Sequence, residues 1–210
     1  MHLVQRCQSF IIIMLLTGVF SLQSVPLVQA DPSRTSTEPL LVIPGLTVRT
    51  SIEPLLVIPG LTVAPGTGSI LVRTHDAVGA TVHAFGLVPG NVYSFWVTAF
   101  NNPKKCATTP CSAADVPNPE VQVSITFGSS QIAGEDGTVD FTAFRAVGDL
   151  TGVYLGPGLL KPYKAQIHLV VRSHGPASAD PAVLQQQLTM FNGGCPPNTC
   201  MNAEVAIHEP

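Results

Sequence analysis

The chain has 210 residues, of which 11% are charged and 45% are hydrophobic, and its formal net charge is -3. This length is enough for one well-buried domain, and not comfortably for two. The ten basic residues form no cluster larger than the pair Lys104 and Lys105. Because nucleic acids and anionic membranes are bound by clustered basic side chains, neither is an expected partner.

The first 30 residues have the organisation of a secretory signal peptide. Arg6 precedes an apolar run that begins at Phe10, and Val28 and Ala30 stand where a signal peptidase reads the chain. This pattern predicts cleavage near Ala30. The apolar run is shorter than the roughly 18 residues that a membrane-spanning helix needs, and no later stretch reaches that length. We therefore expect a secreted or periplasmic protein whose mature chain has no transmembrane segment.

Residues 31–68 contain a tandem duplication. The stretch EPLLVIPGLTV occupies residues 38–48 and again residues 53–63, with a period of 15 residues. Each copy places a Pro-Gly pair between two apolar runs, which is typical of strand, turn and strand. Two interpretations stay open. The segment adds a strand to a partner or to its own domain, or it duplicates a leading strand of which the fold uses only one copy. The second interpretation predicts a loosely attached first copy.

From residue 69 to the C-terminus, seven short runs of apolar residues alternate with turn residues. They cover residues 69–75, 80–87, 91–100, 121–128, 138–147, 165–174 and 203–208. A parallel sheet would need long amphipathic helices between these runs, and the sequence has none. The spacing predicts an all-β fold, an antiparallel immunoglobulin-like or fibronectin-like β-sandwich of about seven strands over residues 69–210.

One short helix is expected after the sixth run. Asp180 has the character of an N-cap, and Pro181 suits the first helical position. Asn192 and Gly193 supply the expected stop signal.

The run at residues 91–100 has two distinct faces. Tyr93, Phe95 and Val97 share one face, whereas Trp96 and its alternate neighbours share the other. Tyr93 follows a Pro-Gly turn, an arrangement that resembles the tyrosine corner of immunoglobulin-like sandwiches, in which the hydroxyl bonds to backbone a few residues upstream. Trp96 is expected to fill a core rather than to form a ligand platform.

Four cysteines follow the predicted signal peptide. Cys106 and Cys111 lie in CATTPC, and Cys195 and Cys200 lie in CPPNTC, so four residues separate the members of each pair. In an oxidising compartment this spacing predicts two local disulfides, each adding about 2 kcal/mol by closing a small loop. The alternative is a single zinc site with all four cysteines as ligands.

Four blocks of the sequence carry a resemblance to a known group of proteins. LVPGNVYSFWVTAFNNPKKC, VGDLTGVYLGPGLLKP, AQIHLVVRSHGP and FNGGCPPNTC resemble, in content and in order, a group of uncharacterised secreted bacterial proteins. The resemblance covers residues 69–210. It implies export, a β-sandwich and paired cysteines, and it implies no reaction.

Histidines are the candidate metal ligands, because neutral imidazole is the commonest side-chain ligand for copper or zinc. His168 and His174 are six residues apart in one predicted strand, so they share a face but lie about 20 Å apart at roughly 3.3 Å per residue. One metal cannot bind both unless the strand ends before His174. The sequence therefore favours a site across strands, built from His83, His168 and His208.

Two further expectations concern these histidines: an added oxygen ligand, and a structural role in place of metal binding. Asp76 or Glu204 could add an oxygen ligand to such a site. Each histidine could instead have a structural, hydrogen-bonded role, and His174, which precedes Gly175 and Pro176, is expected to be a turn residue.

A catalytic constellation is not predicted. The chain lacks a Gly-x-Ser-x-Gly nucleophile motif, and the carboxylates Glu135 and Asp136 belong to a turn. We expect an exported, non-enzymatic binding or cell-envelope module for an unknown extracytoplasmic ligand or protein, with the loops at residues 101–119 and 193–202 as its contact surface. A histidine-based copper or zinc protein is the second hypothesis, and an unrecognised hydrolase is the third.

Overall fold

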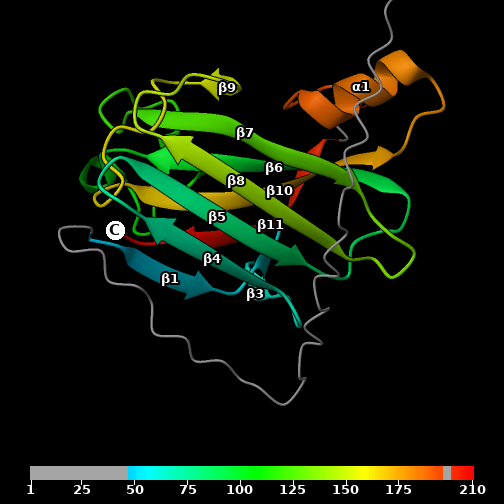
Figure 1. Ribbon diagram of the computed structural model, residues 1–210, viewed down its shortest axis with the longest axis horizontal. Coiled ribbons are helices and arrows are strands. Elements are labelled where there is room, and N and C mark those ends of the chain that lie inside the picture. The colour runs from blue at the N-terminus through cyan, green and yellow to red at the C-terminus, as the bar shows by residue number, and fades with distance from the viewer. Residues whose placement is uncertain (1–46, 196–199) are drawn as a thin grey trace, which may run out of the picture. The chain divides into compact units, whose positions relative to one another are not determined.

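The chain folds into two antiparallel β-sheets, one in front of the other in the computed structural model, which describes residues 47–195 and 200–210 (Figure 1). The smaller sheet has the strand order β1-β4-β5-β8, and the larger has the order β3-β2-β11-β10-β6-β7-β9. Buried apolar residues from both sheets form one cluster between them. The predicted all-β antiparallel sandwich is confirmed.

The described part of the chain contains more strands than the seven expected. The smaller sheet consists of β1 (Arg49–Glu53), β4 (Gly68–Arg73), β5 (Ala77–Ala84) and β8 (Val139–Ala146). The larger consists of β2 (Leu56–Val57), β3 (Thr62–Val63), β6 (Asn91–Phe100), β7 (Val123–Ile132), β9 (Val153–Leu155), β10 (Gln166–Pro176) and β11 (Met201–His208). Each of the seven predicted runs forms a strand, and β1, β2, β3 and β9 are additional.

The helices are short. Two 3-10 turns, η1 (Pro103–Lys105) and η2 (Ala113–Asp115), lie in the loop between β6 and β7, and α1 (Pro181–Thr189) lies between β10 and β11. Asp180 caps α1 by accepting a hydrogen bond from the Ala182 amide at 2.8 Å, as predicted. The helix ends at Thr189, three residues before the expected stop at Asn192.

The core between the sheets is built from alternate residues of the central strands. Phe95 of β6 and Phe141 of β8 pack with their ring centroids 5.6 Å apart, and Leu169 of β10 is fully buried beside them in the same cluster. Burying one such side chain contributes roughly 1.5–3 kcal/mol. Gly128 forms a bulge in β7 opposite Phe95, where a Cβ atom would lie 2.7 Å from the Phe95 ring, so only glycine leaves room for that ring.

A second apolar cluster covers the outer face of the larger sheet. Trp96 and Phe100 of β6 pack there with Val170 of β10, beneath Cys111 and Val121 of the β6–β7 loop. Trp96 is buried, as predicted, but it fills this outer cluster rather than the space between the sheets. The larger sheet is therefore buried on both faces at its centre.

Tyr93 lies on the opposite face of β6 and forms the predicted corner. Its hydroxyl accepts a hydrogen bond from the Val88 amide at 3.0 Å, five residues upstream, and its side chain is buried in the core between the sheets.

The duplicated segment belongs to the sandwich. In the second copy, β2 and β3 form a hairpin around Pro59 and Gly60, and β2 pairs with β11 at the edge of the larger sheet. The pattern of strand, turn and strand is thus correct, and this copy adds strands to its own domain. The expected domain boundary at residue 69 is too late, because β1 to β3 precede it. Apart from Thr47 and Val48, the first copy lies outside the described residues.

The repeat extends beyond the 11 identical residues. Residues 34–48 and 49–63 differ at a single position, which is Thr37 in the first copy and Ile52 in the second. Ile52 is 72% exposed, whereas Leu55 of the same copy is fully buried in the core. Either copy therefore carries every buried side chain that β1, β2 and β3 supply.

Deletion of either copy should leave the stability almost unchanged. Removal of residues 49–63 places residues 34–48 directly before Ala64 and restores the same contacts, with threonine at one exposed position. We expect both single deletions to unfold within about 3 °C of the intact chain, because about 1 kcal/mol corresponds to 2–4 °C at this size.

Deletion of residues 34–63 is the matched control. It removes Leu55 and the three strand pairings made by β1, β2 and β3, and should lower the melting temperature by about 10 °C. Thermal unfolding followed by circular dichroism compares the intact chain with the three deletion variants. If the variant without residues 34–48 were stable and the variant without residues 49–63 were unfolded, the two copies would not be equivalent.

Candidate functional site

A cavity of about 470 Å³ lies against the larger sheet, and the β5–β6 turn that joins the two sheets closes one side of it. One wall is the hairpin of the duplicated segment, and the others come from the β5–β6 turn and from strands β6, β10 and β11. Most of the lining side chains are apolar. They include Val57, Ile58, Phe85, Leu87, Val88 and Met201.

Glu204 is the acidic residue of this lining. It occupies the same face of β11 as Ala206, which belongs to the core between the sheets, and its side chain is 3% exposed. Its cross-strand neighbours are Val171 of β10 and Val57 of β2, neither of which can pair with a charge. Its Oε2 atom is buried and has no hydrogen-bond partner among the described residues.

The apolar surroundings of Glu204 change its titration. Burial raises the pKa of its carboxyl group from 4.5 to about 7, against a smaller opposing effect from the charge of His83. A buried carboxyl group without a partner costs free energy in its charged form, and a perturbed pKa in a cavity is characteristic of functional groups. Glu204 is thus a polar residue of the cavity lining whose buried Oε2 lacks a partner within the described part of the chain.

The predicted site of His83, His168 and His208 is wrong, because the three side chains occupy three different surroundings. His83 lies on the solvent face of β5 and pairs with Asp140 at 2.7 Å. His168 lies on the outer face of the larger sheet, where its ring centroid is 4.7 Å from that of Phe100. His208 faces the smaller sheet, and its ring nitrogens bond to Ser51 Oγ at 2.7 Å and to Ser69 Oγ at 2.9 Å.

The other two candidate ligands do not complete that site either. Asp76 accepts a hydrogen bond from the Thr74 hydroxyl at 2.7 Å on the exposed β4–β5 turn. Glu204 lies in the cavity described above. The structure supports the hydrogen-bonded, structural interpretation for His83, His168 and His208.

Both predicted cysteine pairs lie at disulfide distance, with Cα atoms 5.4 Å apart in each pair. Cys106 and Cys111 are close to Asp115, whereas Cys195 and Cys200 are close to His174. The two pairs belong to separate groups of side chains, so the four-cysteine zinc site is not formed.

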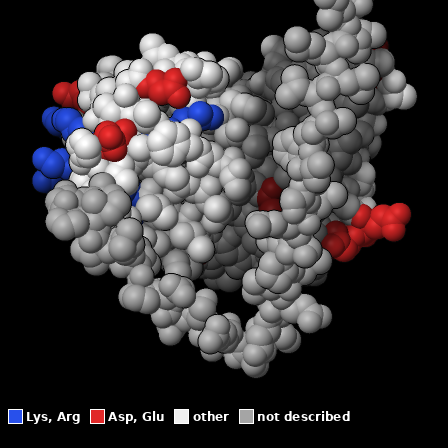
Figure 2. All heavy atoms as spheres, in the orientation of Figure 1, with Lys and Arg blue, Asp and Glu red and all other residues white. Residues whose placement is uncertain are grey.

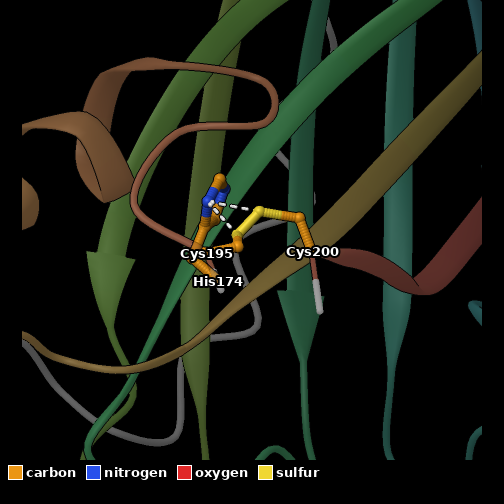
Figure 3. A group of neighbouring side chains, drawn as sticks. All are labelled: His174, Cys195 and Cys200. Atoms are coloured by element: carbon orange, nitrogen blue, oxygen red, sulfur yellow. Dashed lines mark hydrogen bonds between the residues drawn. A yellow bond between two sulfur atoms is a disulfide. The ribbon is translucent and has the colours of Figure 1, made fainter. Parts of the chain in front are cut away.

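The group around His174 was not anticipated. His174 is fully buried rather than a turn residue. Its Nδ1 atom lies 3.4 Å from Cys195 Sγ and 3.5 Å from Cys200 Sγ, and the ring points at the sulfur pair in Figure 3. One imidazole nitrogen and two sulfur atoms within 4.8 Å of one another form a group that could hold a metal ion.

Asp115, which lies beside Cys106 and Cys111, is committed to hydrogen bonds within its own loop. It accepts hydrogen bonds from the amides of Ala107 at 2.6 Å and Ser112 at 2.7 Å, which lower the pKa of its carboxyl group. It also completes a capping box with Ser112 at η2. Because these bonds occupy its oxygens, Asp115 is a loop-building residue rather than a free ligand.

Arg172 holds the loop that carries the second cysteine pair. Its guanidinium donates to the side chains of Asn202 at 2.7 Å and Asn192 at 2.6 Å, and to the Cys200 carbonyl at 3.0 Å. It also packs over the Phe191 ring, 4.3 Å from the centroid. The chain on either side of the cysteines is therefore fixed to β10.

Sequence patterns could have found Glu204, but not the His174 group. In AEVAIH the alternation places Glu204 on the face of Ala206, which marks it as an inward carboxylate. The distance between His174 and the two cysteines depends instead on how the loop after α1 returns to β10, and no local pattern encodes that path.

Comparison with known proteins identifies no matching family model, no matching curated protein and no matching solved structure. Within residues 47–195 and 200–210, no helix is long and apolar enough to cross a membrane.

Glu204 should make the folded protein less stable as the pH rises. The folded-state pKa is raised, so the favourable contribution is present in full below about pH 4.5 and is lost as the pH passes through about 7. Glu204→Gln removes this loss. We expect the variant to exceed the wild type by up to about 3 kcal/mol in unfolding free energy at pH 8, and to match it near pH 4.

Urea unfolding at the two pH values measures this difference. The exposed Glu135→Gln is the control and should follow the wild type at both. An equal effect of Glu204→Gln at pH 4 and pH 8 would show that the carboxyl group has an ordinary pKa.

The titration of His168 should lower the stability of the folded protein as the pH falls, which is the opposite of the pH dependence expected for Glu204. Burial, with a smaller contribution from the charge of His208, lowers the pKa of His168 from 6.5 to about 4. Its contribution to stability is therefore present above pH 6.5 and is lost as the pH falls toward 4. In a Glu204→Gln background, His168→Gln should reduce the loss of unfolding free energy between pH 7 and pH 4 by about 3 kcal/mol. An unchanged slope in urea unfolding would contradict the burial of a neutral His168.

Proposed function

We propose that the protein is an exported binding module for a small, mainly apolar molecule that carries a cationic nitrogen. The observation that carries the proposal is Glu204, which lines an apolar cavity and whose buried Oε2 has no hydrogen-bond partner among the described residues. An ammonium group bound there would supply the missing partner, and the apolar remainder of the ligand would fill the cavity.

The dimensions and chemistry of the cavity support this ligand class. Small-molecule sites typically have volumes of roughly 300–1,000 Å³, apolar linings and a few polar groups that orient the ligand. The cavity, of about 470 Å³, falls in this range. A buried carboxylate favours a cation because the interaction is stronger in surroundings of low dielectric constant.

Binding is a better-supported function than hydrolysis. Glycoside hydrolysis needs two carboxyl groups, and the lining contains one. Tyr93 also contributes to the lining, but its hydroxyl already accepts the Val88 amide. Ser173 Oγ accepts from the Gly175 amide at 3.4 Å and has no histidine base beside it among its described hydrogen bonds.

We also propose that the protein is exported and that its partner is not a nucleic acid. The signal-like N-terminus and two cysteine pairs at disulfide distance support an extracytoplasmic location. On the face of the molecule that Figure 2 shows, the acidic and basic groups are scattered and form no broad basic patch. Such a surface suits a small uncharged or singly charged ligand better than a nucleic acid.

Three six-carbon probes with different head groups test the proposal. Hexylamine carries the cation, hexanol is its neutral match and hexanoate is its anionic match. At pH 8 we expect calorimetry to give the order hexylamine, hexanol, hexanoate, with hexylamine at least tenfold tighter than hexanol. Glu204→Gln should abolish the preference for the amine over the alcohol, because it removes the carboxylate and keeps the shape.

The pH and a distant variant provide the controls. The preference for the amine should decline from pH 8 to pH 5, as Glu204 becomes protonated, and Glu135→Gln should bind like the wild type. Equal binding of hexylamine and hexanol at pH 8, or a preference that survives Glu204→Gln, would refute the role of Glu204.

A further inference from the structure

We propose that His174, Cys195 and Cys200 form a redox-gated metal site, which is closed by the disulfide and binds one zinc ion when the disulfide is reduced. This site is separate from the Glu204 cavity, which does not include any of the three residues. The proposal rests on the position of the histidine, the anchoring of the loop and the chemistry of the ligand set.

The first argument is the position of His174. A disulfide needs no histidine, yet the fully buried imidazole places Nδ1 within 3.4 Å and 3.5 Å of the two sulfur atoms. The three ligand atoms come from the end of β10 and from both sides of the short cysteine loop (Figure 3). Two thiolates and one imidazole are a typical zinc ligand set with an open fourth position.

The second argument is the support of the other ring nitrogen. Nε2 of His174 lies 2.7 Å from Ser94 Oγ, and Ser94 Oγ also accepts a hydrogen bond from Trp96 Nε1 at 2.7 Å. Metal-bound histidines usually have their second nitrogen fixed by such a bond, which orients the ring. Both partners are buried on the outer face of β6, so the orientation does not depend on the disulfide.

The third argument is that the ligands stay together after reduction. Arg172 bonds to Asn192 before Cys195 and to Asn202 and the Cys200 carbonyl after it. Loss of the sulfur–sulfur bond therefore frees neither side of the loop. The positive guanidinium also favours thiolates over thiols nearby. Both cysteines are half-buried, so reductant and metal can reach them.

In the oxidised protein, the hydrogen-bond acceptors around His174 determine which ring nitrogen carries the proton. The Gly193 carbonyl lies 3.0 Å from Nδ1 and can only accept, so Nδ1 carries the proton. In the neutral ring the other nitrogen, Nε2, is the acceptor, and the Ser94 hydroxyl donates to it. Zinc binding at Nδ1 requires the other tautomer, in which Nε2–H donates to Ser94 Oγ.

The complete sequence of steps balances electrons and protons. A dithiol reductant transfers two electrons and two protons to the disulfide, giving two thiols and an oxidised reductant. Zinc then replaces both thiol protons, which leave to solvent, and accepts the lone pair of Nδ1 while the imidazole proton moves to Nε2. Oxidation by a disulfide of higher reduction potential reverses the sequence and releases zinc.

The other cysteine pair is a matched control within the same chain. Cys106 and Cys111 have the same spacing and the same Cα separation, but the acidic residue beside them, Asp115, is occupied by backbone amides. The proposal therefore predicts that reduction of this pair creates no comparable zinc site.

The test measures how strongly the purified protein competes with a chromophoric chelator for zinc. The protein is used in its oxidised form and after reduction with a phosphine, which is removed before zinc is added. We expect one zinc per chain in the reduced protein and none in the oxidised protein. The double variant Cys106→Ser with Cys111→Ser should retain the zinc, and Cys195→Ser with Cys200→Ser should lose it. Circular dichroism checks that each variant is folded.

His174→Gln and Ser94→Ala separate the ligand from its support. We expect the first to weaken zinc binding at least 100-fold, and the second to weaken it about 10-fold, through lost orientation of the ring. Absence of zinc from the reduced protein, equal affinity in His174→Gln, or loss of zinc on removal of Cys106 and Cys111 would each overturn the proposal. None of these results depends on whether amines bind beside Glu204.

Discussion

The larger sheet is buried on both faces at its centre, and this constraint determines most of what is unusual in the molecule. One face of β6 and β10 packs against the smaller sheet, and the other packs beneath the β6–β7 loop and the segment after α1. A simple antiparallel sandwich leaves its outer faces to water and can place polar residues there. Here the polar side chains of the outer face are covered as well, so each of them needs a partner within the protein.

Most of these covered polar groups have such partners. Ser94 Oγ bonds to both Trp96 and His174, and Arg172 is satisfied by carbonyl and amide oxygens around the cysteine loop. On the smaller sheet, Arg73 is buried in the same way and donates to the carbonyls of Ala165 and Glu209. Glu204 differs from this group, because its Oε2 is buried without a partner among the described residues. That contrast is the reason we propose a ligand for Glu204 rather than a structural role.

The sequence predicted the fold where local patterns decide the structure. Alternating runs located the strands from β4 to β8 and β10 and β11, and the structure confirms Asp180 as the helix N-cap and the Tyr93 corner. The weak strands β1 to β3 were less visible, because they are short and gain their stability by pairing with β4 and β11. Their place in the sandwich depends on partners that are distant in sequence.

The sites were harder to predict than the fold. Residue type suggested a cluster of His83, His168 and His208, but strand parity places His168 and His208 on opposite faces of one sheet, and His83 belongs to the other. The spacing of CPPNTC indicated the disulfide and gave no sign of His174, which reaches the sulfur atoms through the tertiary path of the chain. Glu204 could be assigned to an inward position, but the cavity beside it depends on the hairpin of β2 and β3.

The most direct test of the account is a pH titration of the Glu204 carboxyl group, followed by the carbon-13 NMR shift of its carboxyl carbon. The resonance is assigned by its absence from the spectrum of Glu204→Gln. The account predicts a midpoint near pH 7 in the free protein, as burial without a partner requires. It also predicts a clear downward shift of that midpoint when hexylamine is added, because a bound cation stabilises the carboxylate. A midpoint near 4.5 that hexylamine leaves unchanged would contradict both the burial of the carboxyl group and its role in binding.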